Sequence, residues 1–219
     1  MGKLTIPCLA LVTDRRLCQT LSLEEAVAQA IEGGANLVQL REKDPDGRSL
    51  PAAELLALAE KLRAVTRGRA LFLVNDRLDV ALACAADGTH LPERGLPVAA
   101  ARRLAGEGFI IGRSVHSTAE AARAQEEGAD YVQVGSIFAS RSHPGQPVGG
   151  LDLLEAVAAA VTIPILAVGG ITAANVGEAI RAGAGGAAVI SAILGAASPR
   201  EAARALSEAM AAVAAKARP

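Results

Sequence analysis

An amide and two cations alternate in the segment Gln39-Leu40-Arg41-Glu42-Lys43, which completes an apolar run typical of a buried strand. Alternate residues of a strand point to opposite faces, so Gln39, Arg41 and Lys43 share one face and Leu40 and Glu42 share the other. An Arg fork and a Lys point charge together suit a diphosphate group. The competing interpretation, which the segment taken alone favours, is a solvated salt bridge between these cations and Glu42.

Asn75 and Asp76 form a second polar pair after another apolar run. A carboxylate that faces cations and a phosphate suits Mg²⁺, which prefers oxygen ligands and phosphate partners. Asp is also a favourable N-cap, here for a helix expected at Leu78–Ala85. The sequence leaves both interpretations of Asp76 open.

Gly169 and Gly170 follow a third apolar run and precede a predicted helix. Bare backbone amides next to a helix N-terminus bind phosphate well, and (β/α)8 barrels often keep a phosphate site after the seventh and eighth strands. Ile190 and Ser191, at the end of the last apolar run, would form the opposite wall. An ordinary tight turn is the alternative.

The polar loop 139–150 carries Ser140, Ser142 and His143 and is rich in glycine. We interpret it as a lid or phosphate clamp, with a solvated loop as the alternative. His143, together with His90 and His116, lacks the spacing of a metal triad. Each of the three is expected to make hydrogen bonds within the protein or to contact substrate.

Eight apolar runs alternate with eight stretches of helical spacing, which predicts a parallel sheet covered on both faces. The predicted strands are Leu9–Thr13, Leu37–Leu40, Ala70–Val74, Gly88–Leu91, Phe109–Val115, Tyr131–Phe138, Ile165–Val168 and Ala187–Ser191. The predicted helices are Leu23–Glu32, Pro51–Thr66, Leu78–Ala85, Pro97–Ala105, Ala119–Glu127, Leu151–Ala160, Ala174–Ala182 and Pro199–Ala215. Eight units in 219 residues favour a single (β/α)8 barrel domain over residues 1–219, ahead of an open doubly wound sheet. The polar pairs above then meet at the C-terminal ends of the strands.

The composition argues against several classes of binding partner. A formal net charge of −1 and an aromatic content of 2% argue against nucleic acid, and the apolar runs are too short to span a membrane. Cys8, Cys18 and Cys84 lack the spacing of a disulfide framework or zinc site, so we expect reduced thiols and a cytoplasmic location. The expected partners are small phosphorylated molecules, and a homodimer stays open.

Seven segments in order, QLREKD, LVNDRLDVAL, ADGTHL, GADYVQVGSIF, SRSHPG, ILAVGGI and AAVISAI, resemble the thiamine phosphate synthase and TenI family over nearly the whole chain. The resemblance implies a (β/α)8 barrel. Synthase members join hydroxymethylpyrimidine diphosphate to hydroxyethylthiazole phosphate and release pyrophosphate. TenI members instead tautomerise a thiazole phosphate carboxylate and need no metal.

The resemblance also assigns roles to individual residues. The pyrimidine diphosphate would be held by Gln39, Arg41, Lys43, Asn75 and Ser114, with Mg²⁺ on Asp76. The thiazole phosphate would be held by Gly169, Gly170, Ile190 and Ser191, with Ser140, Ser142 and His143 in the clamp loop. Arg41, Lys43, Ser114 and His143 are the predicted catalytic residues, because positioned cations stabilise a departing diphosphate.

The sequence departs from the pattern of each branch of the family. Gly95 stands where synthases carry a second Mg²⁺ carboxylate, and Glu93 is the nearby candidate to replace it. His143 replaces the Lys of the synthase clamp loop, and Ser136 stands where tautomerases carry a His. Because the diphosphate cradle is kept, we place the synthase first and the tautomerase second, with His143 as its candidate acid-base group.

Two further hypotheses are kept. The loss of a carboxylate at Gly95 is compatible with a regulator that binds a thiazole or thiamin phosphate without turnover. Other phosphate-binding barrels, such as indole glycerol phosphate or ribulose phosphate enzymes, share the Gly169-Gly170 turn, but the Gln39–Lys43 segment does not suit them.

Overall fold

The computed structural model describes residues 4–18, 20–43, 48, 50–139 and 148–215. Eight strands run through it in the predicted order. They are β1 (Cys8–Val12), β2 (Leu37–Leu40), β3 (Leu71–Asn75), β4 (Gly88–Leu91), β5 (Ile110–Val115), β6 (Tyr131–Val134), β7 (Ile165–Val168) and β8 (Gly186–Val189). The strands pair in parallel from β1 to β8, and β8 pairs with β1, so the sheet is a closed barrel. The predicted (β/α)8 barrel is confirmed.

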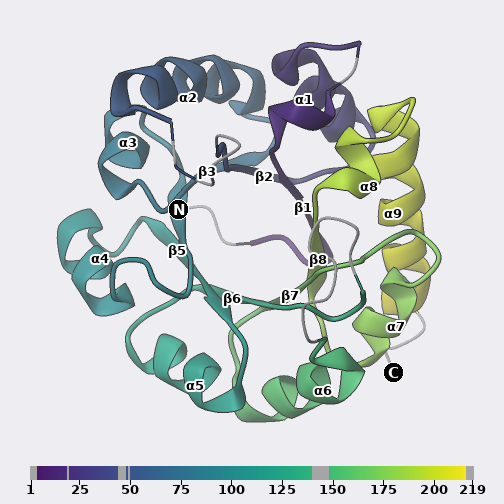
Figure 1. Cartoon of the computed structure of the whole chain (residues 1–219). Coiled ribbons are helices and arrows are strands. Elements are labelled where there is room, and N and C mark those ends of the chain that lie inside the picture. The colour runs from purple at the N-terminus through teal and green to yellow at the C-terminus, as the bar shows by residue number, and fades with distance from the viewer. Residues whose placement is uncertain (1–3, 19, 44–47, 49, 140–147, 216–219) are drawn as a thin grey trace.

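Helices form a ring around the barrel (Figure 1). They are α1 (Leu23–Glu32), α2 (Ala52–Thr66), α3 (Leu78–Ala83), α4 (Val98–Ala105), α5 (Thr118–Glu126), α6 (Gly150–Ala160), α7 (Val176–Arg181), α8 (Ser191–Leu194) and α9 (Pro199–Ala214), with a 3-10 turn η1 (Arg15–Leu17). No described helix combines the length and the apolar character that crossing a bilayer requires.

Local sequence signals explain where helices begin and end. Ser22 and Glu25 form a reciprocal capping box at the start of α1, and Ser198 caps α9 ahead of Pro199. Just after α1, α5 and α7, Gly34, Gly128 and Gly183 have φ values of 109°, 93° and 98°. This left-handed conformation suits Gly because Gly lacks a Cβ.

Two apolar cores fill the structure. A large one lies between the strands and the helices, and a smaller one lies inside the barrel, where Leu37, Leu73, Tyr131 and Leu166 meet. Tyr131 fits because β5 has Gly112 beside it: a Cβ at Gly112 would lie 2.1 Å from the Tyr131 Cζ. The barrel interior is thus packed below its C-terminal end.

The structure differs from the sequence-based prediction in three places. Strand β6 ends at Val134 rather than at Phe138, although the Ile137 and Phe138 N–H groups still donate to carbonyls of Val168 and Gly169. The short elements η1 and α8 were not predicted, since three or four residues carry too little periodicity. Ser191, expected at the end of the last strand, is the first residue of α8. The remaining boundaries agree within two residues.

Candidate active site

The inward-facing residues nearest the C-terminal ends of the strands form two unlike halves. Amide, imidazole and hydroxyl groups face inward from β2 to β6, as Gln39, Asn75, His90, Ser114 and Gln133. All five are linked to one another or to Tyr131 by side-chain hydrogen bonds. The β7–β8–β1 side is apolar there, with Val12, Val168 and Ile190 packed against the inner core. The polar half contains the predicted pyrimidine diphosphate residues, and the apolar half adjoins the predicted thiazole phosphate residues.

Gln39 and Asn75 lie in direct contact. The Gln39 Nε2 donates to the Asn75 Oδ1 at 3.0 Å, and the Gln39 Oε1 accepts from the Gln133 Nε2 at 2.8 Å. Gln39 is buried, whereas Asn75 is only partly buried. The structure therefore brings together two of the predicted substrate residues, and it adds Gln133, which the sequence analysis missed.

Arg41 follows Gln39 on the same face and is half-buried. Burial lowers the pKa of its guanidinium, and the carboxylate of Asp14 raises it. An arginine stays charged despite such shifts. Within the described part of the chain its guanidinium makes no hydrogen bond or ion pair. A partly desolvated cation without a partner is costly unless an anion binds it, so this geometry favours an anionic ligand. Lys43, the next residue on that face, is half-buried too.

Glu42 points away from these cations into a buried position and is 4% exposed. Its carboxylate accepts from the Thr13 Oγ1 at 2.7 Å and from the Arg15 backbone N–H at 3.3 Å. Burial raises the pKa of Glu42, and the Thr13 hydrogen bond opposes that shift. The alternative of a solvated salt bridge to Arg41 or Lys43 is therefore wrong. Glu42 instead fixes the segment after β1 against the end of β2.

Asp76 is the exposed residue that directly follows β3, and its φ of 65° lies in the left-handed region. Its backbone N–H donates to the His90 carbonyl at 2.8 Å, which locks the turn. The N-cap position of α3 is taken by Arg77, and no side-chain capping bond forms there. The capping interpretation of Asp76 is thus not realised. A strained backbone at the mouth of a barrel is typical of functional residues.

Gly95 is the residue of the β4–α4 loop that faces this carboxylate. A Cβ built on Gly95 would lie 2.9 Å from the Asp76 Oδ1. The second carboxylate that the resemblance implies at this position would therefore project beside Asp76, and this chain has no side chain there. The Glu93 carboxylate lies 3.7 Å from the Nε2 of His116, and the Glu93 carbonyl accepts from Arg113. Among the described residues no group of three or more His, Cys, Asp or Glu side chains could hold a metal ion.

Ser114, the predicted pyrimidine contact, is partly buried and is held by a histidine. The His90 Nε2 lies 2.8 Å from the Ser114 Oγ, and the His90 Nδ1 lies 3.0 Å from the Tyr131 hydroxyl. His90 is 1% exposed, and burial, with smaller contributions from Arg113 and Arg41, lowers its pKa to about 3. Its imidazole is therefore neutral near pH 7. His90 is a hydrogen-bonding residue in the protein, as expected.

The predicted phosphate turn lies at the end of β7. Gly169 and Gly170 have φ values of 97° and 63°, and a Cβ on Gly170 would meet the Ala139 carbonyl oxygen at 2.4 Å. The Asn175 Nδ2 donates to the Gly170 carbonyl at 2.9 Å, which orients the turn. Ser191 begins α8 with Ile190 as the N-cap residue, and the first backbone N–H groups of this helix have no partner within it. Backbone N–H groups at a helix N-terminus suit a phosphate.

Ser140, Ser142 and His143 lie outside the described residues, so the predicted clamp loop stays a prediction. The residues that sequence reasoning missed are Tyr131 and Gln133. Their spacing by two on a strand was the available signal, because it places both side chains on one face of β6. An apolar run gives no indication of which of its faces is inward.

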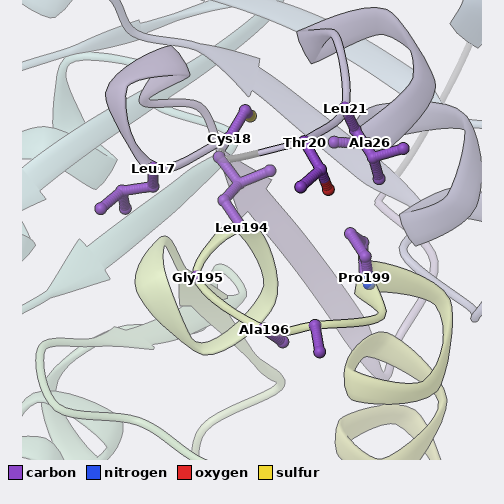
Figure 2. Close-up of a pocket in the computed structure, with 10 residues that line it drawn as sticks. Leu17, Cys18, Thr20, Leu21, Ala26, Leu194, Gly195, Ala196 and Pro199 are labelled. Carbon is purple, nitrogen blue, oxygen red and sulfur yellow. The ribbon is translucent and has the colours of Figure 1, made fainter.

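A pocket of about 410 Å³ lies between the segment after β1 and the α8–α9 connection, and none of the polar strand-end residues described above lines it (Figure 2). Its lining combines aliphatic side chains such as Leu17, Leu194 and Pro199 with polar atoms, among them the Thr20 hydroxyl. Burial raises the pKa of the Cys18 thiol there, so the thiol is not activated as a nucleophile. Among the described residues that line this pocket none is a cation, so it is less suited to a phosphorylated substrate than the strand ends near Arg41.

Comparison with known proteins agrees with this geometry. A family model described as thiamine monophosphate synthase matches residues 9–193. Thiamine-phosphate synthase of Methanoculleus marisnigri is 46% identical over 212 residues, which cover 96% of this chain and 98% of that relative. Thiamine-phosphate synthase of Moorella thermoacetica is 49% identical over 187 residues, covering 84% and 86% of the two chains.

A solved structure extends the comparison. The thiamine phosphate pyrophosphorylase of Pyrococcus furiosus is 39% identical, has a TM-score of 0.82, and covers 94% of this chain and 96% of its own. The chain therefore belongs to the thiamine phosphate synthase and TenI family.

Proposed function

We propose that the chain is a thiamine-phosphate synthase, a transferase that joins hydroxymethylpyrimidine diphosphate to hydroxyethylthiazole phosphate and releases pyrophosphate. Its curated relatives at 46% and 49% identity carry the synthase name. The observation that carries the proposal is half-buried Arg41, whose guanidinium has no protein partner among the described residues and which follows the hydrogen-bonded Gln39 on the same face of the chain. A tautomerase would have no diphosphate for this cation to bind.

The proposed reaction needs no nucleophile from the protein. The bond between the pyrimidine methylene carbon and the diphosphate oxygen breaks, and its electron pair leaves with pyrophosphate. The thiazole nitrogen then uses its lone pair to form the new carbon–nitrogen bond. Arg41 and Lys43 stabilise the charge that grows on the departing diphosphate, and the amide of Asn75 donates to the same oxygens.

The other side of the mouth would hold the second substrate. Gly169 and Gly170 offer a turn that is free of side chains, and the first N–H groups of α8, at Ser191, follow the neighbouring strand β8. The apolar side chain of Ile190 would pack against the thiazole ring. Ser114, held by His90, would contact the pyrimidine ring.

Mg²⁺ fits this site in a restricted way. The exposed Asp76 carboxylate makes no hydrogen bond among the described residues, and the neighbouring Gly95 contributes no second ligand. One protein carboxylate suffices for Mg²⁺ when substrate phosphate oxygens supply further ligands. We therefore propose that Asp76 holds Mg²⁺ only together with the diphosphate, where the ion would neutralise phosphate charge.

The thiols agree with the proposed cytoplasmic setting. Cys8, Cys18 and Cys84 are all free in the structure, as expected in a reducing compartment. The homodimer remains a prediction.

The test is one incubation of purified protein with pyrimidine diphosphate, thiazole phosphate and Mg²⁺, with pyrophosphate and thiamin phosphate measured together. We expect equal amounts of both products, none after chelation, and a large loss in Arg41→Ala. The matched control is Arg123→Ala, which removes an exposed cation paired with Glu127 on α5. Absence of product with tautomerisation of the thiazole carboxylate would refute the synthase, as would tight binding of thiamin phosphate without turnover.

A further inference from the structure

Three amides form a directed chain across the barrel. The Gln133 Nε2 on β6 donates to the Gln39 Oε1 on β2 at 2.8 Å, and the Gln39 Nε2 donates to the Asn75 Oδ1 on β3 at 3.0 Å. Gln133 and Gln39 are 4% and 2% exposed, so water does not compete for these bonds. The chain begins in the packed interior and ends at the partly buried Asn75 in the mouth.

The direction of this chain decides which atom Asn75 presents. A side-chain amide has an acceptor end and a donor end, and its two ends differ in charge preference. Because Gln39 occupies the Asn75 Oδ1, the Nδ2 of Asn75 is the end left for the mouth, and it has no partner among the described residues. An amide donor there attracts phosphate oxygens, whereas the reversed amide would present an oxygen that repels them.

The interior end is anchored in a second hydrogen-bonded group. Burial raises the pKa of the Tyr131 phenol well above its usual value, and a hydrogen bond with Gln133 lowers it. The Tyr131 hydroxyl in turn lies 3.0 Å from the His90 Nδ1, and His90 leads to Ser114. Gln133 thus connects to both sides of the polar half.

We propose that Gln133 is a positioning residue for the pyrimidine diphosphate, whose buried amide donates to Gln39 and thereby turns the Asn75 N–H groups toward the diphosphate oxygens. Gln133 does not touch the substrate itself and acts through Gln39. This inference rests on the proposed function, because it requires that Asn75 bind the pyrimidine diphosphate.

The decisive variant is Gln133→Met, which keeps the length of the side chain and removes its donor. Gln39 and Asn75 are then free to turn round, and part of the population presents the wrong atom to the ligand. By titration calorimetry we expect the affinity for hydroxymethylpyrimidine diphosphate to fall about 3- to 30-fold. The affinity for hydroxyethylthiazole phosphate should stay within about twofold, because that ligand lies on the other half of the mouth.

Gln125→Met is the matched control. The Gln125 Oε1 accepts from the Thr162 backbone N–H at 2.7 Å on the outside of the barrel, so the same substitution removes a structural amide far from the mouth. It should lower stability without changing either affinity. A merely structural role of Gln133 would make the two variants behave alike.

A measurement on the unaltered protein keeps the inference testable if Gln133→Met does not fold. In ¹⁵N-labelled protein, the side-chain amide signals of Asn75 should shift when the pyrimidine diphosphate is added, and those of Gln125 should not. Wild-type protein that fails to bind this ligand would overturn the proposed function and the inference together. Wild-type binding with an unchanged affinity in Gln133→Met, or with unmoved Asn75 signals, would overturn the role of Gln133 alone.

Discussion

His90 should make the stability of the protein depend on pH. Its imidazole is buried and neutral in the folded state, with a pKa lowered from 6.5 to about 3. An unfolded chain exposes the same group, which then binds a proton near its ordinary pKa. Between these two values the unfolded state holds more protons than the folded state, so stability falls as pH falls through this window.

The size of the effect follows from the shift. A pH of 5 lies about 1.5 units below the ordinary pKa of the unfolded imidazole, and each unit corresponds to about 1.36 kcal/mol. Through His90 alone, the free energy of unfolding is therefore about 2 kcal/mol lower at pH 5 than at pH 7.5. This is a sizeable part of the stability of a typical domain, and it moves a urea midpoint by about 1 M.

The assay is urea unfolding of the wild type and of His90→Gln at pH 7.5 and at pH 5. Each protein is compared with itself, so the destabilisation that the substitution causes cancels. Between pH 7.5 and pH 5, the free energy of unfolding should fall by about 2 kcal/mol more in the wild type than in His90→Gln. His116→Gln, which removes a half-exposed imidazole from the loop after β5, serves as the control for losing a histidine. Equal losses in the wild type and in His90→Gln would refute the argument that the buried imidazole is neutral.

Three further results are expected. Arg41→Ala should raise the KM for the pyrimidine diphosphate about 10- to 100-fold through loss of charge-assisted hydrogen bonds, with little change for the thiazole phosphate, in initial-rate assays; similar small changes for both would return Arg41 to a structural role. In Mg²⁺ titrations, Asp76→Asn should raise the concentration for half-maximal rate and Glu93→Gln should not, since the Glu93 carboxylate lies beside an imidazole; the opposite order would exchange their roles. Gly112→Ala should lower the free energy of unfolding by about 1–3 kcal/mol in urea, because the new Cβ would lie 2.1 Å from the Tyr131 Cζ; unchanged stability would show that the phenol moves aside freely.

The local sequence determined the elements and their order. Alternation of short apolar runs with helical spacing was enough to predict the barrel, because both periods are properties of neighbouring residues. The same applies to the glycines that end helices, because a positive φ at one position favours Gly at that position. The strand-end location of Arg41, Asn75 and Asp76 followed in turn, since parallel strands of a barrel end on one face.

Only the tertiary structure decided what those polar residues contact. Glu42 could pair with Arg41 or turn away, and burial against Thr13 settled that choice. Gln133 and Gln39 are 94 positions apart in sequence and bond only because closure of the sheet brings β2 and β6 face to face. Periodicity gives the face on which a side chain lies, but a hydrogen bond across a barrel depends on the register of every strand between its partners.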